Sequence, residues 1–253
     1  MSRQRFSTAE PVSPELMLRK ATLARSSGMR AKYARRGLSH DGMVDRTTRA
    51  MLLRQLYLSH MEARRFAEAL KIAEQMVDIG IMPDVARQDA ARACLGFRDA
   101  EQAIVHLRLA SRVSPPSRRA FHLWTLGSVL YLAGRPRDAI GALQRAARWG
   151  TTDKPLYHAQ AALARLACGE TVDNLRVLRE RLADAACGQG YGQFVLGELS
   201  YELGELDEAR RYLRAFVKRS TGGRIALQVA LSGELQRTRR LLARIQRKRL
   251  KSA

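Results

Sequence analysis

A pattern of two short helices joined by a turn recurs in this chain about every 35 residues, and this period constrains the fold more than any other feature. Within each expected pair, one small residue stands just inside the second helix. These positions are Ala69, Ala103, Ala139, Asn174 and Ala209, and neighbours along this series are 34 to 36 residues apart. A steady period of this length is typical of a helical solenoid, in which each pair packs on the next. The sequence therefore predicts an all-α fold of stacked antiparallel helix pairs.

The stretch "LGSVLYLAGRPRDAIGALQRA" shows how one pair is made. We expect a helix over about 119–133 and a second over about 136–149, with Gly134 in the turn between them. Glycine adopts positive φ at little cost, and Pro136 is tolerated at the first position of the second helix, where no partner for its nitrogen is needed. The equivalent turn positions in the other pairs hold Arg64, Arg98, Gly169 and Gly204. The sequence therefore predicts a tight turn at each of these positions.

The first helices of three pairs carry large residues around a Leu-Gly or Leu-Tyr step. These residues are Leu53, Leu56 and Tyr57, then Leu123, Leu126, Gly127 and Leu130, then Leu196, Gly197 and Tyr201. The pattern resembles the tetratricopeptide repeat over about residues 49–223, and it is weakest in the fourth pair, where Asn174 replaces alanine. The resemblance implies a right-handed superhelical solenoid of five to six repeats with a C-terminal capping helix. HEAT-like or other helical pairs remain the alternative.

Three regions follow from this division of the chain. Residues 1–48 form a basic helical arm, alternatively a degenerate first repeat, which Gly28 divides and which a linker over 37–42 ends. Residues 49–222 carry the tetratricopeptide-like repeats. Residues 223–253 form a basic capping helix and tail, whose apolar stripe covers the last repeat. That stripe consists of Leu231, Leu235, Leu242 and Ile245.

Family resemblance also indicates where a partner would bind. In such solenoids the first helices line a concave groove, and the few aromatic residues of this chain concentrate at those places. The predicted groove residues are Arg54, Arg92, Phe121, Trp124, Tyr131, Tyr191, Phe194 and Tyr201. Large rings with arginine nearby are good anchors for a peptide or a helix of a partner protein. The competing interpretation is that Trp124 and Phe194 only pack between neighbouring helices.

The charge of the chain is strongly positive, with 45 Lys and Arg against 24 Asp and Glu. Such a balance attracts acidic protein surfaces and polyanions. The C-terminal segment contains a run of cations with no acid among them. The predicted basic patch is Arg237, Arg239, Arg240, Arg244, Arg247, Lys248 and Arg249. This run indicates binding to phosphate backbones, acidic proteins or anionic lipid, or else the solvated face of a capping helix.

Signals of catalysis are missing from the sequence. Its five histidines are scattered, its three cysteines have no paired metal-ligand spacing, and it contains no nucleotide-binding or nucleophile motif. We therefore expect no enzyme, no cofactor and no metal. No apolar run is long enough to span a membrane, and the first eleven residues lack the apolar core of a secretory signal, so we expect a cytoplasmic protein.

Together these features predict a non-catalytic adaptor that holds a partner peptide or helix, of acidic character in view of the charge, in the concave groove. Two alternatives remain open. The chain is a nucleic-acid-associated protein that uses its basic ends, or it is a structural subunit of a larger assembly. The sequence leaves the oligomeric state undetermined.

Overall fold

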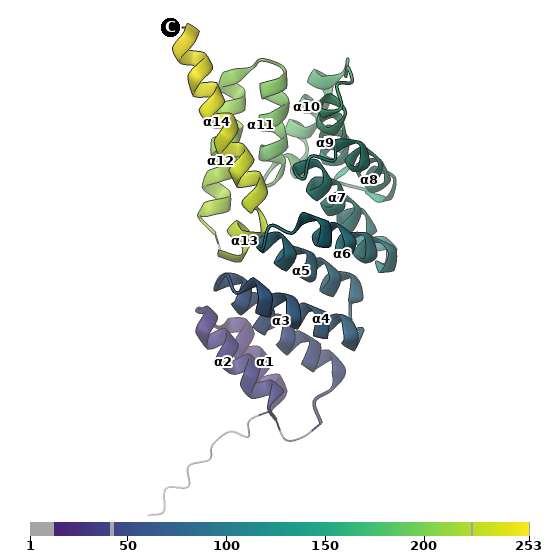
Figure 1. The fold of residues 1–253 in the computed structure, drawn as a ribbon, viewed down its shortest axis with the longest axis vertical. Coiled ribbons are helices and arrows are strands. Elements are labelled where there is room, and N and C mark those ends of the chain that lie inside the picture. The colour runs from purple at the N-terminus through teal and green to yellow at the C-terminus, as the bar shows by residue number, and fades with distance from the viewer. Residues whose placement is uncertain (1–12, 41–42, 224, 253) are drawn as a thin grey trace, which may run out of the picture. The chain divides into compact units, whose positions relative to one another are not determined.

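The computed structural model describes residues 13–40, 43–223 and 225–252, and all regular structure within them is helical (Figure 1). The all-α class and the antiparallel helix pairs are confirmed. The chain divides into two compact units, Met1–Ile81 and Met82–Ala253. The sequence placed boundaries after residues 48 and 222 instead, because repeat periodicity does not show where packing between pairs is continuous.

The first unit contains two helix pairs. Its helices are α1 (Pro14–Leu23), α2 (Ser27–Leu38), α3 (Arg46–Glu62) and α4 (Phe66–Ile79). Ser13, Ser26 and Asp45 cap α1, α2 and α3 by accepting hydrogen bonds from backbone N–H groups at the helix starts. Gly28 lies inside α2, so the helix break falls at Ala24–Ser26 rather than at the glycine. The basic arm is thus a helical hairpin that packs on α3.

The second unit begins with four helix pairs, the third of which ends in a short 3₁₀ turn, and closes with two more helices. Its elements are α5 (Pro83–Gly96), α6 (Ala100–Val113), α7 (Pro116–Leu132), α8 (Pro136–Trp149), α9 (Lys154–Ala167), α10 (Leu175–Asp184), η1 (Ala186–Gly188), α11 (Gly192–Glu202), α12 (Leu206–Thr221), α13 (Ile225–Ala230) and α14 (Ser232–Ser252). Among the described residues, no helix is long and apolar enough to cross a membrane.

The predicted turns are present at all five positions. Gly134, Gly169 and Gly204 have φ of 76°, 81° and 79°. Arg64 and Arg98 adopt the same left-handed conformation, with φ of 56° and 68°, which is strained for a residue with a side chain. The turn geometry is therefore required by the helix pairing itself, even where glycine is absent.

Small residues allow the two helices of a pair to approach closely. Ala69, Ala103, Ala139 and Ala209 are each 0% exposed. On the facing helix, a Cβ added to Gly127 would lie 2.6 Å from Leu143 Cγ, so glycine is required there. Asn174 does not join this series, because it stands before the first residue of the short helix α10 and is exposed. The fourth pair is therefore the least regular, as its weak pattern indicated.

The C-terminal helices extend further than a cap on the last repeat would. The stripe is partly as expected, because Leu235 and Ile245 are buried and α14 packs on α12. However, α13 also contacts α5, which belongs to the first pair of the unit. A Cβ added to Gly233 at the start of α14 would lie 3.4 Å from Leu132 Cδ1 in α7. The last two helices thus run from α5 past α7 to α12 (Figure 1).

Candidate interaction surface

Six side chains from the first helices of the second unit form two hydrogen-bonded groups, which we together call the inner cluster. Its members are Trp124, Ser128 and Tyr131 of α7, Gln160 of α9, and Tyr191 and Glu198 at α11. Helices α7, α9 and α11 belong to successive pairs, so their equivalent faces turn toward the same side of the unit. The inner cluster therefore occupies the position at which the sequence predicted a groove.

Aromatic rings connect the inner cluster to the core. Trp124 lies edge-to-face against Tyr191, with ring centroids 4.8 Å apart. Tyr191 contacts Phe194, and Phe194 contacts Phe216 of α12. Phe194 is 0% exposed, so it is a core residue and its predicted role in a groove is wrong. A ring facing α12 packs between helices, as the competing interpretation held.

Hydrogen bonds satisfy the polar members of the inner cluster. Trp124 Nε1 donates to Gln160 Oε1 over 2.8 Å, and Gln160 Nε2 donates to Ser128 Oγ over 3.0 Å. Tyr131 Oη donates to Glu198 Oε2 over 3.0 Å. Gln160 is 0% exposed and Glu198 is 2% exposed, so these bonds compensate for lost hydration. The sequence did not identify Gln160, because one glutamine among alanines carries no distinguishing signal.

Arg237 of α14 enters the inner cluster. Its guanidinium donates hydrogen bonds to Glu198 and to the Tyr131 hydroxyl, and its Cζ lies 4.7 Å from the centre of the Tyr131 ring. Burial raises the pKa of Glu198, although Arg237 and Tyr131 oppose that rise. Tyr131 is 5% exposed, so its side chain contacts Arg237 and is almost fully shielded from solvent. Arg237 is therefore paired with Glu198 and Tyr131, although its side chain is 40% exposed, and its place in the basic patch stays a prediction.

Glu234, one helical turn before Arg237, makes the second polar contact of α14. Its carboxylate accepts a hydrogen bond from the Tyr191 hydroxyl over 3.2 Å. Burial raises the pKa of Glu234 to about 7 and raises the pKa of Tyr191 well above its usual value. A carboxyl group with this pKa changes charge near neutrality, so the start of α14 is sensitive to pH.

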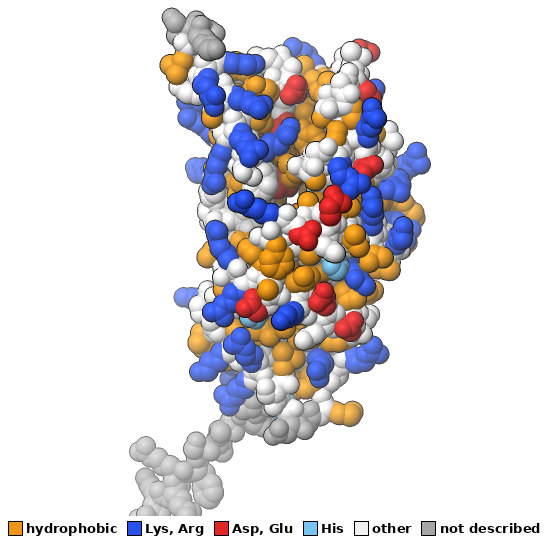
Figure 2. Space-filling view, viewed as in Figure 1, with side chains coloured by type: hydrophobic (Ala, Val, Ile, Leu, Met, Phe, Trp, Pro, Cys, Tyr) orange, Lys and Arg blue, Asp and Glu red, His pale blue; other side chains and the backbone are white. Residues whose placement is uncertain are grey.

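Most other described residues of the predicted basic patch are exposed on α14. Figure 2 shows Lys and Arg side chains along the course of this helix. The exposed cations are Arg239, Arg240, Arg244, Arg247 and Lys248. Lys248 Nζ lies 4.8 Å from the ring centre of Tyr201, a predicted groove residue that is half-buried under α14. The side chain of Arg249 lies outside the described residues.

Three residues beside the inner cluster remain accessible, and we call them the open edge: Arg92, Arg118 and Phe121. Phe121 is 42% exposed, and its ring contacts both Trp124 and His122. The side chains of Arg92 and Arg118 are 36% and 42% exposed. The open edge therefore combines an exposed ring with two cations, and it includes the predicted groove residues Phe121 and Arg92.

A buried ionic link that the sequence did not reveal supports the open edge. Arg118 donates to both oxygens of Asp84 over 2.7 and 3.0 Å, and His122 Nε2 lies 2.9 Å from Asp84 Oδ2. Burial raises the pKa of Asp84, but the bonds from Arg118 and His122 outweigh it and hold this pKa below its usual value. Burial lowers the pKa of His122 despite Asp84. The link joins α5 to α7.

Arg54 lies in the first unit, on α3, and is half-buried. Because it belongs to the other compact unit, it is not part of the inner cluster or the open edge as defined here. In the same unit, Arg30 forms an ion pair with Glu62 and is buried, whereas Arg19, Lys32, Arg35 and other cations of α1 and α2 are exposed. The helical arm therefore presents a basic surface.

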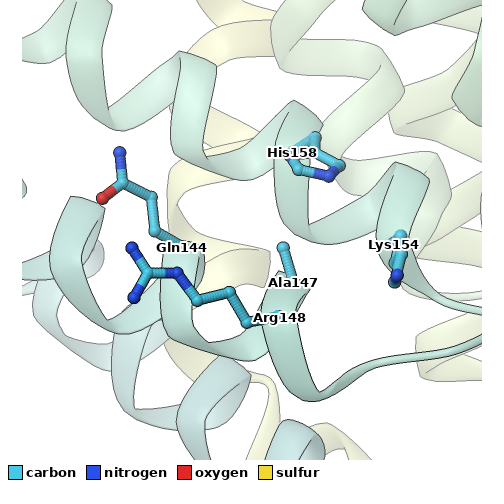
Figure 3. Close-up of a pocket in the computed structure, with 5 residues that line it drawn as sticks. All are labelled: Gln144, Ala147, Arg148, Lys154 and His158. Carbon is cyan, nitrogen blue, oxygen red and sulfur yellow. The ribbon is translucent and has the colours of Figure 1, made fainter.

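A shallow hollow of about 440 Å³ lies between α8 and α9 (Figure 3). Gln144, Ala147 and Arg148 line it from α8, and Lys154 and His158 line it from α9. The ends of Gln144 and Arg148 lie on one side of Ala147, and Lys154 and His158 lie on the other, so their polar groups do not converge. Within the described residues, no three His, Cys, Asp or Glu side chains are placed to hold a metal ion.

No protein-family model matches the chain, and no curated protein matches it in sequence. Among solved structures, the apo form of RapI matches with a TM-score of 0.56 and 13% identity, over 81% of this chain and 82% of that one. The fold is tetratricopeptide-like. At 13% identity, the similarity of this chain to RapI shows a shared fold and does not show a shared function.

Two further solved structures match less well. A Rap protein complexed with Competence and Sporulation Factor has a TM-score of 0.42 and 14% identity, over 95% of this chain and 74% of that one. The P58(IPK) TPR domain has a TM-score of 0.30 and 11% identity, over 94% and 78% of the two chains.

Proposed function

We propose that this chain is a non-catalytic interaction protein that binds a helix or peptide of a partner protein at the open edge and the inner cluster. The observation that supports this proposal is that the inner cluster already holds a helix, because α14 is bound there through Glu234 and Arg237. The face therefore has the shape and the polar groups that a helix requires.

Charge at the open edge favours an acidic partner. The side chains of Arg92 and Arg118 are 36% and 42% exposed, and the ring of Phe121 is exposed as well. An apolar residue of the partner would cover the ring, and a neighbouring carboxylate would pair with Arg92. A large ring flanked by arginine is the composition of strong interface anchors.

Site-specific photo-crosslinking in the cells of origin tests this proposal. A photoreactive amino acid replaces Phe121, and the matched control carries it at Val105 of α6, which is 47% exposed on the second helix of its pair. We expect a discrete protein adduct at position 121 whose yield falls with Arg92→Gln, and no such adduct at position 105. Identical adducts at the two positions, or none at position 121, would contradict the proposal.

A second candidate function is binding to nucleic acid through α14. It is favoured by the four exposed arginines Arg239, Arg240, Arg244 and Arg247, with no acid between Leu235 and the end of the helix. About four phosphate contacts predict that the logarithm of the affinity falls with the logarithm of salt concentration with a slope of roughly −3 to −4. Fluorescence anisotropy with duplex and single-stranded oligonucleotides measures this slope, and absence of binding at low salt excludes the function.

A further inference from the structure

The chain's own C-terminal segment, Ile225–Ser252, covers the inner cluster. Its first helix contacts α5, and its second contacts α7 at Tyr131 and α11 at Glu198. These helices are the first members of their pairs. In helical repeats, the first helices form the face that is offered to a partner. The face that the proposed function assigns to a partner's helix is thus occupied by a helix of the same chain.

Recognition of this segment depends on two side chains one helical turn apart. Glu234 and Arg237 lie on the same side of α14, because residues three apart are neighbours on a helix. The face is complementary to both, since the Tyr191 hydroxyl donates to Glu234 and the Glu198 carboxylate accepts from Arg237. Such an arrangement selects a helix with an acid three residues before an arginine.

Packing of the segment is poor for a permanent part of the core. The described apolar side chains that it buries are four, namely Val229, Leu235, Leu241 and Ile245. Thr238 is 0% exposed, and its hydroxyl has no hydrogen-bond partner among the described residues. Among the described residues, the buried carboxylate of Glu234 accepts one side-chain bond, of 3.2 Å, besides a bond to its own backbone N–H. Buried polar groups that are left poorly satisfied reduce the net gain of seating the helix.

Two apolar residues of α13 also remain at the surface, since Ile225 is 50% and Leu227 is 43% exposed. Figure 2 shows hydrophobic side chains gathered in the region of α13 and α5. Exposed apolar side chains and a buried carboxylate both reduce the stability of the seated segment. Its displacement therefore costs less free energy than displacement of a fully packed helix.

We propose that Ile225–Ser252 is a resident substitute for the partner's helix, and that the partner displaces it with a helix carrying an acid three residues before an arginine. This inference rests on the proposed function and names the chemistry of its partner. While the segment is seated, the inner cluster is closed, and only the open edge is available for a first encounter.

The test uses the full chain with Leu132→Cys and Gly233→Cys, at two positions in contact, since a Cβ at 233 would lie 3.4 Å from Leu132 Cδ1, in a background with Cys168→Ser and Cys187→Ser; mass spectrometry verifies the disulfide in the oxidised form. The oxidised form locks α14 onto α7, and the reduced form leaves it free, so one polypeptide serves as its own folding control. The probe is a fluorescent synthetic peptide with the sequence of residues 225–252. Because the tethered segment competes at an effective concentration of the order of millimolar, the peptide is titrated into that range.

We expect the reduced form to bind the probe and the oxidised form to bind it about tenfold or more weakly, because a locked segment cannot vacate the face. A probe carrying Arg237→Glu should not bind the reduced form. Hydrogen exchange should show amides of residues 234–245 exchanging about tenfold or more faster than those of α11 in the reduced form, and equally slowly after oxidation.

Equal binding of the probe by both forms, no binding by the reduced form, or equal protection of α14 and α11 in the reduced form overturns the inference. These measurements need no natural partner, so their failure is distinct from failure of the proposed function, which shows itself as the absence of an adduct at position 121.

Discussion

Replacing Glu234 with glutamine should change how the stability of the second unit depends on pH. Glu234 is 7% exposed, and burial raises the pKa of its carboxyl group from 4.5 to about 7. Since one pKa unit corresponds to about 1.4 kcal/mol, this rise amounts to about 3 kcal/mol of unfolding free energy. Glutamine keeps an oxygen that accepts the bond from Tyr191 but cannot ionise.

The sign follows from proton uptake. Between pH 4.5 and about 7 the folded chain holds a proton on Glu234 that the unfolded chain has lost, so the stability of the wild type falls as pH rises through this window. Glu234→Gln does not have this penalty. We expect the two proteins to be about equally stable at pH 4.5, and the variant to be more stable by up to about 3 kcal/mol at pH 8.

Urea unfolding followed by tryptophan fluorescence measures this difference, because Trp124 and Trp149 both lie in the second unit. Glu74→Gln on the exposed surface of α4 is the matched control and should follow the wild type at every pH. A constant difference between Glu234→Gln and the wild type from pH 4.5 to 8 would refute the assignment of a buried, protonated carboxyl group.

Four further substitutions test the packing of the fold by chemical denaturation. Gly127→Ala should destabilise by about 1–3 kcal/mol because its Cβ would overlap Leu143, whereas Gly141→Ala, with nothing within 4 Å, should stabilise its helix by about 0.5–1 kcal/mol; the opposite order would contradict the close approach of α7 and α8. Arg98→Gly should stabilise by about 1 kcal/mol because φ at this position is 68°, and a loss of stability would show that the turn is not strained. Asp84→Asn should destabilise by about 1–2 kcal/mol at pH 7, and an unchanged midpoint would mean that its buried ionic link contributes nothing.

The helix pairs were predictable because their signals are local. A turn that needs positive φ, a proline at a helix start and a small residue at a fixed interval each act within a few residues of the chain. Even Arg64 and Arg98 could be assigned to turns, since the period placed them where glycine stands in other pairs. The weak fourth pair was likewise visible as the loss of one alanine at Asn174.

The candidate site was only partly predictable. Phe121 and Arg92 are accessible, as their helix positions indicated. Phe194, which occupies the same repeat position as Trp124, is fully buried, because Phe216 and Tyr191 pack against it. Helical periodicity predicts which side of a helix a residue occupies. It does not predict which other helices pack against that side.

The sequence by itself determined the repeat, the turns and the excess of cations, because these depend on residue type and on spacing along the chain. Only the tertiary structure decided that α14 covers the inner cluster and that Arg237 pairs with Glu198, 39 residues earlier. The physical reason is that small rotations between successive helix pairs accumulate, and their sum decides which distant helices meet. Side chains that are solvated in an isolated helix become buried partners only after that sum has brought them together.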